Sequence, residues 1–302
     1  MLFMKSISKY FLGILSFMRC RFGRFALSAF ALVSCLWIQP SFASSNQGQA
    51  KQAASKGTSA TQQRQSIRQD FNLKLRLSSD PKAPASTRLA AKLLGQEVQL
   101  AQFQHQIEIQ DRRFEIRYRL DLPGAAATVS GIEYIARSGE GNITVDGLQG
   151  QRITERRGAK GDYYEAKVEH DGKLVGIYKN QKKIKDEAIS KIRTDLTSLP
   201  YFWLGKPVKP GRLRIDVIDT KKVFHEDFVG KPTNARFQGQ LIKAVQFDKV
   251  KRGPDDAELT ILVRESDGFP LRIDLGLSAK YGITALMFPQ TIPPANLSLQ
   301  HR

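Results

Sequence analysis

The sequence predicts a mainly β protein, in which roughly ten strands form a curved antiparallel sheet, an incomplete barrel, covered by one or two helices. Three observations support this fold class. Apolar and polar residues alternate with a period of two over most of the chain from Phe71 onward. Glycine, proline and Asp-Gly pairs separate the alternating stretches. Two segments show the spacing of an amphipathic helix instead.

The clearest alternation runs from Phe114 to Arg157. Its first strand places an apolar residue at every second position, at Phe114, Ile116, Tyr118, Leu120 and Leu122. Such a strand buries one face and exposes the other, which is typical of antiparallel sheets. After Pro123-Gly124 the pattern resumes and passes through Tyr134 to Arg157. This stretch predicts a meander.

The remaining strands follow from the same period-two pattern. They are expected at Phe71–Leu77, Phe103–Ile109, Tyr163–Val168, Leu174–Tyr178, Leu213–Val217, Val223–Val229, Phe237–Val250, Leu259–Val263 and Leu271–Leu277. A single flat sheet of this size should curl. The curvature is inferred, because a closed barrel or a sandwich would show the same alternation.

Two helices are expected to cover the inner face of the sheet. A short one spans Ser86–Leu94 and stops at Gly95. A longer one spans Ile184–Leu199, with its apolar residues on one face, and ends at Pro200. The apolar cluster Tyr201–Leu204 follows and is expected to anchor this helix against the sheet. A curved sheet around a helix would enclose an apolar concavity.

The N-terminus predicts export to the periplasm. Five basic residues precede the uncharged run Phe25–Ile38, and Ser41-Phe42-Ala43 matches a signal-peptidase site. We expect cleavage after Ala43, which leaves no integral membrane segment. Two alternatives stay open. The run could be a retained anchor, although it is shorter than a span needs, and Leu32–Cys35 resembles a lipobox whose cysteine would be acylated.

Cysteine content and charge restrict the partners. Cys20 and Cys35 both lie in the expected signal, so the processed protein would have no thiol for a disulfide, zinc cluster or nucleophile. The signal holds five basic and no acidic residues, so five of the +18 formal charges are lost and +13 remain. A basic exported protein meets anionic envelope components rather than nucleic acid. Most basic residues nevertheless alternate with apolar ones, as on a solvated sheet face.

Four segments make up the expected organisation. Residues 1–43 are the signal peptide and residues 44–69, rich in Gln, Ser, Ala and Lys, are a disordered linker. Residues 70–288 form one half-barrel domain, and residues 289–302 form a loose tail.

Catalytic and metal-binding patterns are weak. The four histidines lack metal-ligand spacing, and no nucleophile elbow, phosphate loop or dinucleotide fingerprint occurs. His225-Glu226-Asp227 is expected to be a solvated turn, Glu155 an ion-pair partner of neighbouring arginines, and Asp255-Asp256 part of a charged hairpin tip. We therefore expect a protein that is not an enzyme and needs no cofactor or metal.

A series of short motifs runs through the strands: Gly147-Leu148, Glu155–Gly158, Tyr164–Ala166, Asp195–Leu199, Lys209–Gly211, Lys249–Arg252, Phe269–Ile273 and Tyr281-Gly282. Together these motifs resemble an exported bacterial family, the domain of unknown function 3108. The resemblance covers roughly Phe114 to Leu286. It implies a fold similar to the periplasmic lipoprotein carriers, a curved sheet with helices as a lid. It implies no activity and no binding residues, and carrier function by analogy of fold is a weak inference.

Two functional hypotheses result. The first is a periplasmic protein whose half-barrel binds a lipid or lipidated ligand on its concave face, through Phe114, Ile116, Tyr118, Tyr134 and Trp203. The second is an envelope scaffold whose concavity is filled by its own side chains, and whose basic surface binds an anionic cell-wall polymer or a protein partner.

Overall fold

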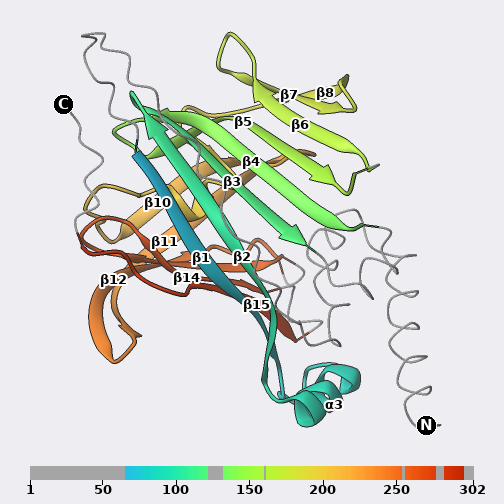
Figure 1. Ribbon diagram of the computed structural model, residues 1–302, viewed down its shortest axis with the longest axis vertical. Helices are drawn as coiled ribbons and strands as arrows, with labels where there is room; N and C mark the ends of the chain where they lie inside the picture. Colours follow the sequence, from blue (N-terminus) through green and yellow to red (C-terminus); the bar gives the residue numbers. More distant parts are fainter. Residues whose placement is uncertain (1–64, 122–131, 160, 254–255, 277–281, 296–302) are drawn as a thin grey trace, which may run out of the picture.

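The computed structural model describes residues 65–121, 132–159, 161–253, 256–276 and 282–295 (Figure 1). Within these residues fifteen strands form a single sheet, accompanied by one α-helix, so the protein is mainly β as expected, with more strands than roughly ten. The elements are β1 Gln65–Leu77, α3 Ala85–Leu94, β2 Glu97–Gln110, β3 Arg113–Asp121, β4 Tyr134–Ile143, β5 Leu148–Arg157, β6 Tyr163–Val168, β7 Leu174–Lys179, β8 Lys182–Ala188, β9 Arg193–Asp195, the 3-10 turn η1 Leu199–Tyr201, β10 Gly211–Ile218, β11 Val223–Phe237, β12 Gln240–Lys249, β13 Glu258–Arg264, β14 Pro270–Gly276 and β15 Ile283–Pro289.

The sheet consists of two meanders that meet at its centre. Its strand order is β8-β7-β6-β5-β4-β3-β2-β1-β15-β14-β13-β12-β11-β10-β9. β1 pairs with β2 on one side and with β15 on the other, where Phe71 faces Pro289 and Leu77 faces Ile283. Every pairing is antiparallel except that of β9 with β10. The first and last described strands thus join the two halves.

The sheet is curved but not closed. β8 and β9 are its two edges, and no strand pairing joins them. The curvature brings the segment around β9 back against the first half, where the Leu148 amide donates to the Phe202 carbonyl at 3.0 Å. The two halves cross each other in Figure 1. The architecture is therefore an incomplete barrel.

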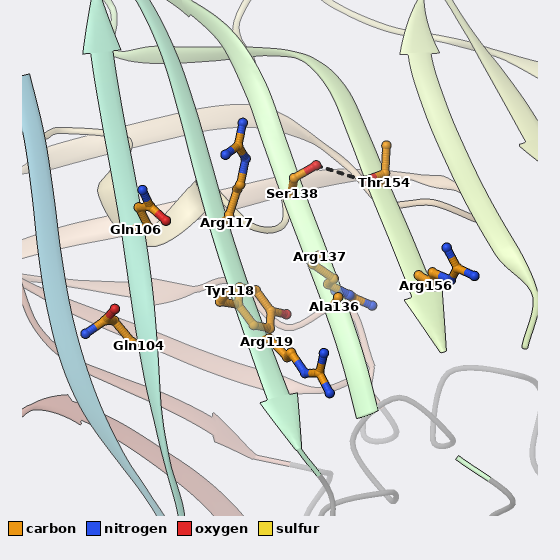
Figure 2. A pocket seen from close by; sticks show the side chains of 10 residues that line it. All are labelled: Gln104, Gln106, Arg117, Tyr118, Arg119, Ala136, Arg137, Ser138, Thr154 and Arg156. Atoms are coloured by element: carbon orange, nitrogen blue, oxygen red, sulfur yellow. Dashed lines mark hydrogen bonds between the residues drawn. The ribbon is translucent and has the colours of Figure 1, made fainter. Parts of the chain in front are cut away.

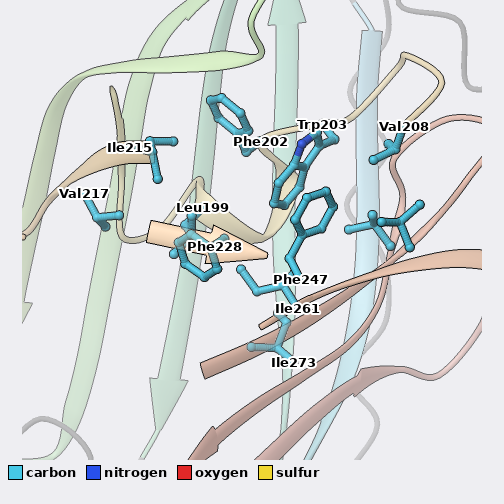
Figure 3. Packing of buried hydrophobic residues seen from close by; sticks show 12 residues of the cluster. Leu199, Phe202, Trp203, Val208, Ile215, Val217, Phe228, Phe247, Ile261 and Ile273 are labelled. Carbon is cyan, nitrogen blue, oxygen red and sulfur yellow. The ribbon is translucent and has the colours of Figure 1, made fainter. Parts of the chain in front are cut away.

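Residues 193–208, which we call the inner segment, occupy the inside of the curve. Tyr201 and Leu204 pack into a core with Phe71, Phe114 and Ile116. Phe202 and Trp203 belong to a second core, in which the Trp203 ring stacks on Phe247 with 4.1 Å between centroids (Figure 3). The chain's own side chains therefore cover both halves of the inner face here.

The prediction of a helix at Ile184–Leu199 is wrong. The structure has β8, β9 and η1 in this region. β8 follows β7 through a tight turn in which Asn180 and Gln181 have φ of 49° and 68°. A turn of this kind favours hairpins but usually contains glycine, so its sequence signal is weak. Ile184 is 57% exposed on β8, and its place in the helical pattern is coincidental.

The short helix is confirmed, since α3 covers Ala85–Leu94 and Gly95 follows it with φ of 88°. No helix in the described part of the chain is long and apolar enough to cross a membrane. Residues 1–43, with the expected signal and Cys35, lie outside the described residues. β1 begins at Gln65, so the last part of the expected 44–69 linker belongs to a strand.

The C-terminal segment is held in place as far as residue 295, contrary to the loose tail expected from Pro289. Pro289 ends β15, a strand that the sequence pattern did not indicate. The Gln69 side chain donates to the Thr291 carbonyl at 2.9 Å, and Arg264 Nη1 donates to the Pro293 carbonyl at 2.7 Å. These bonds fasten the segment to β1 and β13. Residues 296–302 lie outside the described residues.

Candidate functional site

A groove of about 480 Å³ crosses the outer face of β2 to β5. Strand alternation positions it: on β3 the residues with even numbers from Phe114 to Leu120 point inward, so Arg117 and Arg119 point outward. The groove is lined by Gln104, Gln106, Arg117, Tyr118, Arg119, Ala136, Arg137, Ser138, Thr154 and Arg156. Tyr118 and Arg137 also belong to the inner face. We call this site the outer groove.

Differences in side-chain size explain the hollow. The pairing register aligns Gln106, Arg117, Ser138 and Thr154 across four strands, and aligns Arg119 with Ala136 and Arg156. The small residues Ala136 and Ser138 of β4 form the floor between longer side chains of β3 and β5 (Figure 2). The Ser138 and Thr154 hydroxyls lie 2.8 Å apart and hydrogen-bond to each other.

The lining carries positive charge and hydrogen-bond donors, and none of its residues is acidic. Its arginines are oriented by neighbours at the rim. Arg117 pairs with Glu115, and Arg119 Nε donates to Asp121 Oδ1 at 2.8 Å while its guanidinium lies 4.0 Å from the centre of the Tyr134 ring. The pair of Arg119 with Asp121 is exposed on both sides and contributes little energy, whereas Arg117 forms two bonds with Glu115. An external anion would have to compete with these two carboxylates for the arginines.

An acidic row borders the groove on one side. Glu108, Glu115 and Glu140 stand in register on β2, β3 and β4. They line a second hollow of about 930 Å³ near the β2–β3 turn. Among the described residues no group of three acidic, histidine or cysteine side chains is arranged to hold a metal ion. The end of the groove that lies farthest from this acidic row, at Arg119 and Arg156, is therefore the most cationic.

The inner face carries a polar row that the sequence analysis did not identify. Gln69, His105, Tyr118, Arg137, Glu155 and Tyr164 are register partners across β1 to β6. His105 Nδ1 lies 2.8 Å from the Tyr201 hydroxyl, and its ring stacks on Tyr118 with 4.9 Å between centroids. Burial lowers the pKa of His105 to about 3, so the ring is neutral. The row links the sheet to the inner segment.

Glu155 is the centre of this row and is fully engaged. Its Oε2 accepts from Arg137 Nε at 2.6 Å and its Oε1 accepts from Arg157 Nε at 2.6 Å. Burial opposes ionisation, but the Arg137 and Arg157 guanidiniums hold the pKa of Glu155 below its ordinary value. The ion pairing expected for Glu155 is confirmed, although on the inner face, with Arg137 and Arg157 as partners.

The five residues expected to bind a ligand do not meet at one place. Phe114 and Ile116 are buried beneath Tyr201, and Tyr118 stands in the polar row. Trp203 lies in the other core, against Phe247. Tyr134 is on the outer face, because the next residue, Ile135, is the one that points inward. The five residues are therefore divided between the two apolar cores, the polar row and the outer face of the sheet.

The other polar motifs form a hydrogen bond between β10 and β11 and ion pairs on β12 and near β13. His225 Nδ1 lies 2.7 Å from Asp216 Oδ1, on β11 rather than in a turn. Lys249 lies 3.1 Å from Glu226 and 2.7 Å from Asp256, and Lys251 lies 2.7 Å from Glu258. Asp255 lies outside the described residues.

Sequence reasoning assigned the basic residues of the outer groove to a solvated sheet face, and Tyr118 to a ligand site on the concave face. One signal was present: Ala136 and Ser138 are the small outward residues of a strand whose neighbours carry arginine and threonine. That signal becomes useful only once the register of β3, β4 and β5 is known.

Comparisons with known proteins give a similar solved structure and no family. No family model matches the chain, and no curated protein matches it. A crystal structure of a β-barrel-like protein of the domain of unknown function DUF1849 from Brucella abortus is similar over 74% of this chain and 96% of that chain, at 10% identity and a TM-score of 0.40.

Proposed function

We propose that the protein binds an anionic cell-wall polymer through the outer groove, as a non-enzymatic component of the cell envelope. The observation that carries this proposal is the groove's lining, in which Arg117, Arg119 and Arg156 surround a floor of small residues, while the carboxylates that pair with Arg117 and Arg119 stand outside the lining. Carboxylate and phosphate groups are the ligands that guanidinium groups bind best.

The dimensions of the groove favour a polymer over a single small anion. It crosses from β2 to β5, which is about 14 Å at the usual spacing of strands. Arg119 and Arg156 lie two strands apart, so they would contact groups about 10 Å from each other. Gln104, Gln106 and Thr154 add neutral groups that can bond to hydroxyls of a glycan.

The inner face offers less support for the alternative, a carrier of lipid or lipidated ligand. Tyr201 is fully buried, Phe202 and Leu204 are nearly so, and these side chains occupy the space that an acyl chain would need. Lipid uptake would require the inner segment to leave the inside of the barrel. The resemblance to the domain of unknown function 3108 and to lipoprotein carriers remains a prediction.

The cellular setting of the proposal rests on the expected export. Processing after Ala43 would leave a formal charge of +13, which favours association with anionic polymers of the wall. Net charge alone attracts any polyanion. The experiment must therefore distinguish binding in the groove from nonspecific attraction by the net charge.

Cosedimentation with peptidoglycan, measured for two matched variants, distinguishes the two modes of binding. The triple variant Arg117→Gln, Arg119→Gln, Arg156→Gln removes three charges from the groove. The control Arg212→Gln, Arg214→Gln, Arg236→Gln removes three charges from exposed positions on β10 and β11. We expect the groove variant to lose binding more than tenfold, since each charge-assisted bond contributes about 1.5–3 kcal/mol, and the control to bind like the wild type. Equal losses in both variants would refute the groove as the site.

A further inference from the structure

Helix α3 lies at the tip of the hairpin formed by β1 and β2. In Figure 1 it extends beyond the end of the sheet. Its main contacts with other elements are to these two strands, and Ile283 of β15 also packs against the cluster that contains Ala91. The helix begins after Pro84 and ends before Gly95, and β1 and β2 hold both its ends.

The helix presents its larger apolar side chains to solvent. Thr87 and Ala91 are the buried residues, and Ala91 packs against Leu77 and Val98. Leu89 is 58% exposed and Leu93 is 66% exposed, one helical turn apart on the opposite side. The helical spacing of these leucines predicted a helix that covers the sheet, and the structure shows them directed away from it.

The charges around these leucines are mainly basic. Arg88 and Lys92, also one turn apart, flank them, and the helix contains no acidic residue. Lys82 lies in the preceding turn, where Asp80 Oδ1 accepts the Lys82 amide at 2.7 Å. Glu97, at the start of β2, is held by Arg76 at 2.9 Å and by Lys74 at 3.5 Å. The exposed surface of α3 therefore joins leucines to two positive charges, Arg88 and Lys92, that have no ion-pair partner among the described residues.

We propose that α3 docks this protein onto an anionic lipid bilayer. Leu89, Leu93 and the partly exposed Leu94 enter the boundary between headgroups and acyl chains, and Arg88 and Lys92 contact the anionic headgroups. The helix is already folded and held by two strands, so docking requires no ordering of this segment. The basic charge favours a lipid surface over a neutral partner. The outer groove, on β2 to β5, would remain available for polymer.

Flotation with lipid vesicles tests this proposal. The protein is the form recovered from cells that express the full-length sequence, with its N-terminus established by mass spectrometry and identical in all variants. The vesicles contain either phosphatidylglycerol mixed with phosphatidylcholine or phosphatidylcholine alone. The apolar variant is Leu89→Gln with Leu93→Gln, and the charge variant is Arg88→Gln with Lys92→Gln. Leu241→Gln is the matched control, because Leu241 is 68% exposed on β12.

Wild type and the Leu241→Gln control should bind the anionic vesicles. The apolar variant should lose partitioning about tenfold or more, since two leucine side chains no longer enter the bilayer. The charge variant should lose most of the preference for phosphatidylglycerol, about fivefold per charge. Far-UV circular dichroism should be the same for all variants, because the substituted positions are exposed.

Three outcomes would overturn the proposal. The first is that wild type floats with the anionic vesicles no better than its apolar variant. The second is that the control loses binding as strongly as the apolar variant, which would indicate nonspecific adsorption. The third is that sedimentation velocity reveals a dimer that the apolar variant abolishes while neither form binds vesicles, which would assign α3 to a protein interface.

Discussion

The carboxylate of Asp195 lies directly against the Cα of Gly139, so that a β-carbon at Gly139 would collide with it. A β-carbon at Gly150, on the neighbouring strand, would lie 2.6 Å from the Asp195 amide nitrogen. The two glycines allow the inner segment to approach β4 and β5 closely. Asp195 Oδ1 accepts the Thr197 and Ser198 amides at 2.9 and 3.0 Å, which shapes the turn toward η1.

Gly139→Ala should destabilise the protein by about 1–3 kcal/mol, because the added methyl group displaces a buried carboxylate. Urea unfolding followed by tryptophan fluorescence measures the change, since Trp203 lies in the inner segment. Gly253→Ala is the control, because a β-carbon at Gly253 meets nothing within 4 Å. If both substitutions cost the same free energy, the close contact between the inner segment and β4 is contradicted.

Asp195→Asn should change how stability depends on pH. Burial raises the pKa of Asp195 to about 6, above the ordinary 3.8, so the folded state favours the protonated form. The contribution of this group to stability is complete below pH 3.8 and is lost as pH rises to about 6. The variant lacks this loss, and its stability relative to wild type should increase over that interval. A constant difference between the two unfolding curves would contradict the raised pKa.

Glu155→Gln should cost about 3–5 kcal/mol, because it removes the buried carboxylate that Arg137 and Arg157 share. Since the pKa of Glu155 is lowered, its contribution is present above the ordinary glutamate pKa and is lost as pH falls. Glu97→Gln removes an exposed pair with Arg76 and should cost at most about 1 kcal/mol. Thermal unfolding at neutral pH compares the two. Equal losses would mean that Glu155 is no better shielded than a surface carboxylate.

Much of the fold could be predicted from the sequence, because a half-buried strand requires apolar and polar residues to alternate along the chain. The meander from Phe114 to Arg157 corresponds to β3, β4 and β5. The helix predicted at Ile184–Leu199 does not form, and the reason lies in the tertiary structure. Ile184 is exposed at the sheet edge, whereas Leu199 is buried inside the barrel, so the two never share a face. A single-sequence pattern cannot distinguish these environments.

The candidate site depends on information that local patterns do not contain. The outer groove exists because Ser138 stands between Arg117 and Thr154, and this alignment is a matter of register between three strands. Tyr134 was expected on the concave face, but the register places it on the outer face, where Asp121 is its partner on β3. Likewise, nothing in the spacing of Tyr201 to Leu204 shows that these residues fill the inside of the curve.

The most direct test of the proposed function fills the outer groove while keeping every charge. Ser138→Trp places a large side chain on the floor between Arg117 and Thr154, and Gln240→Trp adds the same side chain at an exposed position on β12. Peptidoglycan affinity is then measured for both variants. We expect Ser138→Trp to bind about tenfold more weakly or worse, as when one central contact of an interface is lost, and Gln240→Trp to bind like wild type. Unchanged affinity in Ser138→Trp would show that the polymer binds by net charge elsewhere, and would contradict the groove as the functional site.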